Sequence, residues 1–195
     1  MPKESLPSQY FDQLYQRHED PWNFEGSDYE REKYTATLKA LPRPMYDHAF
    51  EIGCSIGVLT QQLATHCKRL LSVDASEIPL QKARERLRDQ PHVQLQCMSV
   101  PQEFPDHLFD LILVSEVGYY WSPSDLLQAQ QRILEALTPG GHLLLVHWTP
   151  YVEDYPLTGD EVHDSFQEFA RLSGRLQPLH HQQTEQYRLD LWEVR

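Results

Sequence analysis

One stretch in the first third of the chain constrains the fold more than any other. The apolar run 49–52 leads into a Gly-x-x-x-Gly segment, residues 53–57, and a helical pattern begins at Val58. A glycine at such a strand-to-helix turn lets the backbone approach a ligand, because no Cβ stands in the way. The helix that follows directs its unpaired N–H groups toward the same place. This stretch therefore predicts a buried strand, a ligand-binding turn and a helix.

A carboxylate follows the next predicted strand. The apolar run 70–73 ends in Asp74, about twenty residues after the glycine turn. A carboxylate in this position suits the two hydroxyls of a ribose. Two other nucleotide motifs do not fit: the dinucleotide pattern G-x-G-x-x-G meets Glu51 and Ile56 where it needs glycine, and the Gly-Lys-Ser/Thr end of a P-loop is absent.

From residue 48 onward, short apolar runs alternate with helical patterns, which predicts a parallel sheet with helices on both faces. Two closing strands, separated by only a few residues, predict an antiparallel hairpin at one edge. We therefore expect an α/β fold: a Rossmann-like, doubly wound, mostly parallel sheet of about seven strands. The expected strands are 48–52, 69–73, 93–97, 109–114, 142–147, 176–183 and 186–194, and the expected helices between them are 58–67, 76–88, 122–137 and 158–172.

The segment 1–47 precedes this alternation and carries its own helical signals. Tyr10, Phe11, Leu14 and Tyr15 form an apolar stripe at helical spacing, and a second helix is expected from Ser27 to about residue 41. We expect one domain over 1–195, with 1–47 as an N-terminal helical lid and 48–195 as the ligand-binding core.

Composition excludes some partners. The net charge of −12 repels phosphate backbones and argues against a nucleic acid partner. No apolar run reaches the ~20 residues that span a membrane, and the N-terminus has no signal-peptide pattern. The three cysteines, Cys54, Cys67 and Cys97, form no close pair and no metal spacing, so we expect a reduced, cytoplasmic setting without a metal ion. Composition leaves the oligomeric state open.

The pattern acidic-x-Gly-x-x-x-Gly, followed by an acid after the next strand, resembles the first motif of class I S-adenosylmethionine (SAM)-dependent methyltransferases. The resemblance implies that Gly53 and Gly57 lie under the methionine part of SAM and that Asp74 holds the ribose. Glu51 would lie near the amino group of the cofactor, and Pro79 would cover one adenine face. Met98 stands where the family often has an aspartate, and Ser99 could donate to an adenine nitrogen. The full set that we expect around SAM also includes Cys54, Ser55, Ala75 and Val117.

A narrower resemblance covers nearly the whole chain. The segment 20–22, Asp-Pro-Trp, and the aromatic positions around Lys33 and Tyr34 are similar to the start of NodS-like methyltransferases, as are 187–190 near the end. That family is similar to enzymes that N-methylate an amino sugar. The resemblance implies that the N-terminal segment folds over the cofactor, with Trp22, Lys33 and Tyr34 as lid residues and with Lys33 or Arg31 reaching the SAM carboxylate.

The turn after the most apolar strand, residues 115–121, holds the candidates for chemistry. Glu116 precedes Tyr119, Tyr120 and Trp121, and aromatic faces attract a sulfonium or ammonium. We expect these three aromatics and Trp148 to bind the acceptor. An amine must lose a proton before it attacks, and Glu116 or His147 could accept it. The hypothesis is methyl transfer from SAM, with S-adenosylhomocysteine (SAH) as product, to a small amine. The alternatives are transfer to oxygen or sulfur of a small metabolite, or a SAM-binding module without activity.

Overall fold

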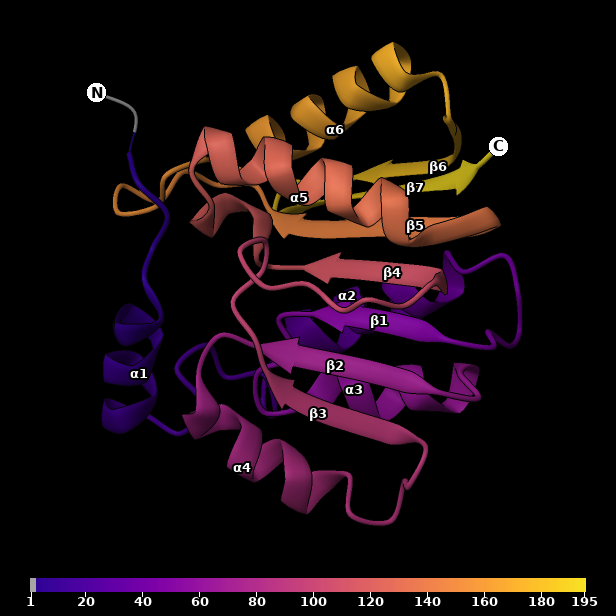
Figure 1. The fold of residues 1–195 in the computed structure, drawn as a ribbon. Coiled ribbons are helices and arrows are strands. Elements are labelled where there is room, and N and C mark those ends of the chain that lie inside the picture. The colour runs from indigo at the N-terminus through magenta and orange to yellow at the C-terminus, as the bar shows by residue number, and fades with distance from the viewer. Residues whose placement is uncertain (1–2) are drawn as a thin grey trace. The chain divides into compact units, whose positions relative to one another are not determined.

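The computed structural model describes residues 3–195, which form two compact units. One unit comprises residues 7–99, and the other comprises 100–195 together with residues 3–6. The chain is drawn in Figure 1, and each unit is described by itself.

The unit of residues 7–99 is built on three parallel strands in the order β3-β2-β1 (Figure 1). β1 is fully buried, and β3 alternates between half-buried and exposed positions. The elements of this unit are α1 (Ser8–Arg17), α2 (Asp28–Lys39), β1 (Ala49–Ile52), α3 (Val58–Leu63), the 3₁₀ turn η1 (Ala64–His66), β2 (Leu70–Asp74), α4 (Glu77–Arg86) and β3 (Val93–Cys97).

Local signals explain where the helices of this unit begin. Ser27 caps α2 by accepting a hydrogen bond from the backbone N–H of Glu30, and Ser76 caps α4 by accepting one from Ile78. The helix expected over 58–67 is α-helical only to Leu63 and then tightens into η1, a common way for a helix to end.

The unit that contains residues 100–195 has four strands in the order β4-β5-β7-β6 (Figure 1). β4 and β5 are parallel, whereas β7 runs antiparallel to both of its neighbours, which confirms the predicted closing hairpin. The elements are β4 (Phe109–Ser115), the 3₁₀ turn η2 (Gly118–Tyr120), α5 (Pro123–Ala136), β5 (Leu137–Trp148), α6 (Gly159–Ser173), β6 (Leu176–Gln183) and β7 (Tyr187–Val194).

The start of β5 differs from the prediction. The segment 138–141 was expected to be a loop, but the strand already begins at Leu137, which pairs with Phe109. The pairing then shifts so that His142 faces Leu111. Gly140, at φ +72°, permits the irregular backbone that joins the two parts of the strand. The predicted fold class is otherwise confirmed, with mostly parallel strands and an antiparallel hairpin.

None of the helices within residues 3–195 combines the length and the apolar character that crossing a bilayer requires.

Candidate functional site

The glycine turn after β1 is tied to the end of β2. The backbone N–H groups of Gly53 and Cys54 both donate to the carbonyl of Val73, at 2.8 and 2.9 Å. Gly53, Ser55 and Gly57 have φ +86°, +48° and +80°, so the turn passes three times through the left-handed region that side chains disfavour. Gly53 is half-buried, so its backbone stays accessible at the strand end. A ligand can therefore approach the main chain at Gly53 without meeting a Cβ.

Asp74 lies beside this turn, as predicted from its place after the second strand. Its Oδ2 accepts the backbone N–H of Ser55 at 2.9 Å, and its Oδ1 accepts that of Ser76 at 3.0 Å. Burial raises the pKa of Asp74 to about 6, although these backbone donors act to lower it. The carboxylate is partly exposed, so it can also accept hydroxyl donors from a ligand.

Gly57 and Glu51, which the sequence analysis assigned to the cofactor, also make packing and hydrogen-bond contacts within the protein. Gly57, at φ +80°, lies against α4: a Cβ there would stand 3.1 Å from Cβ of Ala83. Close helix packing therefore requires this glycine. Glu51 is 1% exposed and accepts a hydrogen bond of 2.7 Å from Ser72 Oγ on β2. Burial raises the pKa of the Glu51 carboxyl to about 7.

Residues of α1, which motif reasoning did not assign to the site, reach the glycine turn. The buried hydroxyl of Tyr15 lies 2.5 Å from Ser55 Oγ, and Asp12 accepts a 2.6 Å hydrogen bond from Ser76 Oγ. The ring of Trp22 packs edge-on against Tyr15 at 5.7 Å, so the predicted lid residue is linked to the turn. The apolar stripe predicts the helix α1 but not its contacts with the turn, because Ser55 and Ser76 lie 40 and 64 residues along the chain from their partners in α1.

The two α2 cations that the sequence analysis assigned to the cofactor, Arg31 and Lys33, have acidic partners on their own helix. Lys33 is 2% exposed, and its Nζ lies 2.9 Å from Glu30 Oε1 and 4.9 Å from the ring centroid of Tyr29. Arg31 pairs with Asp28 at the surface. The structure therefore gives both cations a role within α2, and their contact with a SAM carboxylate stays a prediction. Tyr34, the third predicted lid residue, is buried.

The remaining predicted cofactor residues differ in accessibility. Ala75, Met98, Ser99 and Val117 are half-buried, whereas Pro79 is buried in α4 and Cys54 is 5% exposed. The backbone N–H of Met98 donates to the carbonyl of Asp74 at 2.9 Å, which places Met98 next to the end of β2.

Glu116 occupies a constrained turn at the end of β4. Its φ is +58°, a conformation that costs a non-glycine residue ~1–3 kcal/mol and is typical of functional sites. Its Oε2 accepts hydrogen bonds from the Tyr119 hydroxyl at 2.5 Å and from the Trp148 backbone at 2.9 Å. Its backbone N–H donates to the carbonyl of Val146 at 2.9 Å. The carboxylate is half-buried and held from two directions, as a positioned proton acceptor would be.

The aromatic residues that follow pack as a cluster. Tyr119 stacks on Tyr155 with ring centroids 5.0 Å apart, and Tyr120 meets the same ring edge-on at 4.8 Å. Sequence reasoning missed Tyr155, which lies in the loop before α6. Of the four residues expected to bind the acceptor, Tyr119, Tyr120 and Trp121 are at most 8% exposed, and Trp148 is half-buried.

His147, the second predicted proton acceptor, lies fully inside the unit. Its exposed fraction is 0%, and its Nε2 accepts the backbone N–H of Gly118 at 3.0 Å. The lone pair that a base would use is therefore engaged by a backbone donor. This geometry favours Glu116 over His147 as the acceptor of a proton.

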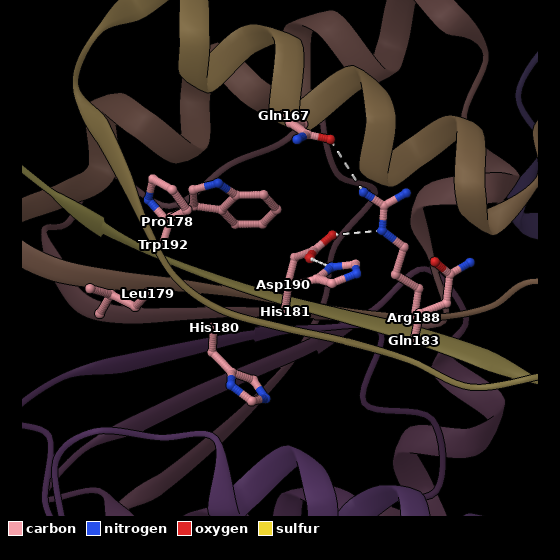
Figure 2. A pocket seen from close by; sticks show the side chains of 9 residues that line it. All are labelled: Gln167, Pro178, Leu179, His180, His181, Gln183, Arg188, Asp190 and Trp192. Carbon is pink, nitrogen blue, oxygen red and sulfur yellow. Dashed lines mark hydrogen bonds and ion pairs between the residues drawn. The ribbon is translucent and has the colours of Figure 1, made fainter.

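A separate pocket of about 530 Å³ lies between α6 and the closing hairpin. Figure 2 shows its lining, in which Arg188 and His181 both contact Asp190. The pocket contains none of the residues that the sequence analysis assigned to the site.

The family model described as Nodulation protein S (NodS) matches residues 10–147. The chain belongs to the NodS family. Nodulation protein S of Rhizobium tropici is 34% identical over 128 residues, which cover 65% of this chain and 54% of that protein. Nodulation protein S of Sinorhizobium fredii is 32% identical over 128 residues, which cover 65% and 59%. The chain thus spans little more than half the length of these curated relatives.

A solved structure of the same family supports the fold over almost the entire length. The crystal structure of N-methyltransferase NodS from Bradyrhizobium japonicum WM9, in complex with SAH, matches with a TM-score of 0.83 at 25% identity and covers 96% of this chain and 97% of that one. This confirms the predicted seven-stranded, Rossmann-like fold class.

Proposed function

We propose that this protein is a SAM-dependent methyltransferase that transfers a methyl group to an amine of a small acceptor. The observation that carries the proposal is the half-buried backbone of Gly53, at φ +86°, in a turn that has the Asp74 carboxylate beside it. Membership of the NodS family supports the same activity, because the NodS crystal structure is described as an N-methyltransferase in complex with SAH.

The residues present fit SAM. The backbone at Gly53 offers a face without a Cβ, which a bulky ligand needs at close approach. Asp74 is a partly exposed acceptor that suits the two ribose hydroxyls. Met98 and Ser99 supply the half-buried surface that we assign to the adenine. When bound, SAM supplies a methyl group on a sulfonium, which is already strongly electrophilic.

The chain itself orients the acceptor and removes a proton. The Glu116 carboxylate, whose Oε2 is held by Tyr119 and by the Trp148 backbone, accepts a hydrogen bond from the attacking amine and takes up its proton. The aromatic cluster of Tyr119, Tyr120 and Tyr155 excludes water from this turn and offers ring faces to a cationic amine. Most of the rate then comes from holding the amine in line with the methyl group.

The experiment is an acceptor screen with labelled SAM and product mass measurement. Transfer to a primary or secondary amine, with a mass gain of one methyl group per turnover, is the expected result. Transfer only to hydroxyls or thiols would replace the N-methyltransferase assignment. SAH binding without transfer to any acceptor would instead indicate an inactive SAM-binding module. We propose a reducing, cytoplasmic setting for the reaction, which the three free cysteines within residues 3–195 support.

A further inference from the structure

Three buried polar side chains from different elements form a row inside the unit that contains residues 100–195. His147 on β5 and His163 on α6 are 0% exposed, and Asp190 on β7 is 5% exposed. His147 Nδ1 lies 3.0 Å from His163 Nε2, and His163 Nδ1 lies 2.6 Å from Asp190 Oδ2. We call Gly118, His147, His163 and Asp190 the histidine chain. None of the hydrogen bonds in the histidine chain takes part in the proton transfer proposed for Glu116.

The direction of each hydrogen bond in the histidine chain is fixed by its first member. The backbone N–H of Gly118 can only donate, so Nε2 of His147 must accept and His147 carries its proton on Nδ1. That proton points to Nε2 of His163, which must accept in turn. His163 therefore carries its own proton on Nδ1 and donates it to Asp190. Both imidazoles are neutral and each has one tautomer.

The carboxylate end of the histidine chain is held in its charged form. Asp190 Oδ1 accepts from His181 at 2.5 Å, and Oδ2 accepts from Arg188 Nε at 2.9 Å (Figure 2). Burial acts to raise the pKa of Asp190, but the hydrogen bonds from His163 and His181 outweigh it, so the pKa lies below its usual value. The pKa of His163 is also lowered, because burial disfavours its charged form.

The other end of the histidine chain holds the turn that carries Glu116. Three consecutive residues of β5 each bind one group of this turn: Val146 accepts the N–H of Glu116, His147 accepts that of Gly118, and Trp148 donates to the Glu116 carboxylate. The side-chain bond of His147 is the link of the three that depends on a tautomer. A change of tautomer at His147 would replace the acceptor facing Gly118 with a second donor.

The packing around Gly118 leaves little freedom to compensate. A Cβ on Gly118 would lie 2.6 Å from Val162 Cγ1 and 2.9 Å from His147 Nε2. A Cβ on Gly159, in the first turn of α6, would lie 2.1 Å from the carbonyl oxygen of Trp148. Glycine at both positions lets the turn and α6 approach β5 from two sides.

We propose that His147, His163 and Asp190 are positioning residues of the methyl transfer, because they fix the turn of Glu116 through one tautomer of His147. The proposal rests on the proposed function, in which Glu116 accepts the proton of the amine. The histidine chain ends at a backbone amide, which neither takes up nor delivers a proton. It therefore sets geometry at Glu116 and does not carry the proton away from it.

The first test reads the tautomers in the parent protein and needs no activity. Imidazole ¹⁵N spectra of the parent at neutral pH should show His147 and His163 as neutral rings with the proton on Nδ1. His163→Phe assigns the His163 signals by removing them. A proton on Nε2 of His147, or a charged His147 ring, would overturn the proposal outright.

The second test compares two substitutions at His163. His163→Phe should leave Nδ1 of His147 without its acceptor, so hydrogen exchange at the Gly118 amide should accelerate. Turnover should fall by on the order of 10²-fold, the loss that a misplacement of ~1 Å can cause. SAH affinity should change less than turnover, because of the residues assigned to the cofactor only Val117 lies in this turn. His163→Gln, whose amide can accept from His147 and donate to Asp190, should restore part of both readouts.

A matched control is available on the same strand. His142 is 1% exposed on β5 and lies outside the histidine chain, so His142→Gln should leave Gly118 exchange and turnover near the parent values. If His163→Phe fails to fold, the proposal is tested by Gly118 exchange and turnover in His163→Gln and by the histidine tautomers of the parent protein. Unchanged Gly118 exchange or unchanged turnover in a folded His163→Phe protein would overturn the proposal. If the parent protein methylates no amine, the proposed function is refuted. The tautomers of His147 and His163 and the hydrogen exchange at Gly118 can still be measured, because they need no activity.

Discussion

Gly53 combines a positive φ of +86° with a half-buried place at the end of β1, so a side chain there introduces backbone strain and, in the proposed site, obstructs the cofactor. We expect Gly53→Ala to raise the dissociation constant of SAH about tenfold or more, which corresponds to ~1.4 kcal/mol. Gly174→Ala is the matched control, because Gly174 also has positive φ, +65°, and nothing lies within 4 Å of its missing Cβ.

Calorimetry with SAH checks this prediction. Both variants lose some stability through strain, of ~1–3 kcal/mol, and only Gly53→Ala should lose affinity. Equal SAH binding by Gly53→Ala and by the parent would show that the cofactor does not approach the backbone at Gly53.

Glu116 is the residue whose carboxylate charge we expect to control turnover. Glu116→Gln keeps the shape of the side chain and removes the acceptor charge, so turnover should fall ~10²–10⁴-fold while SAH affinity is nearly kept. Higher pH should partly restore the rate, because more of the amine is then already neutral. Glu135→Gln, which changes an exposed acid on α5, serves as the control.

Steady-state kinetics across the pH range, with SAH titrations beside them, separate these effects. Near-parent turnover of Glu116→Gln at neutral pH would show that Glu116 does not accept the proton. The rate would then come only from holding the amine in line with the methyl group.

At the scale of elements, α1 and the turn after it are the parts that we expect to respond to the proposed cofactor. Tyr15 and Asp12 of α1 contact Ser55 and Ser76, which flank Asp74. Ordering these serines around a bound cofactor should reduce the local opening of α1. We therefore predict that amide hydrogen exchange over 8–24 slows when SAH binds.

Exchange measured by mass spectrometry with and without SAH gives the comparison, and peptides from α5 supply the internal reference. Identical exchange over 8–24 in both states would mean that α1 is a permanent part of the unit and not a lid.

At the scale of the whole molecule, the buried acid Glu51 links stability to pH. Burial raises its pKa from 4.5 to about 7, so the folded protein holds this proton at pH values where the unfolded chain has lost it. The unfolded state then binds fewer protons, and the free energy of unfolding falls as pH rises between ~4.5 and ~7. The shift corresponds to a loss on the order of 3 kcal/mol, at 1.36 kcal/mol per pKa unit.

Urea unfolding of the ligand-free protein at several pH values tests this link. Glu51→Gln can still accept the hydrogen bond from Ser72 and cannot ionise, so its stability should decline less over that interval. A decline of equal size in the parent and in Glu51→Gln would assign the pH dependence to other groups.

Much of the fold could be predicted because its signals are local. The apolar runs, the glycine turn, the serine caps and the closing hairpin each lie within a few residues of the element they specify. The same holds for Asp74, whose place at the end of β2 follows from the length of one apolar run. The start of β5 was missed because the segment 138–141, Thr-Pro-Gly-Gly, favours a turn, and pairing between Leu137 and Phe109 overrides that preference.

The sequence alone therefore determined the parallel α/β arrangement, the glycine turn with Asp74, and the aromatic turn around Glu116. Only the tertiary structure decided which polar groups meet inside the units. Ser55 and Tyr15 are 40 residues apart, and His163 lies 16 residues from His147 and 27 from Asp190. No local pattern encodes such contacts, because they depend on which face of a helix packs on which strand. Packing of this kind buried His147 and engaged its Nε2 with a backbone amide, which no pattern around residue 147 could indicate.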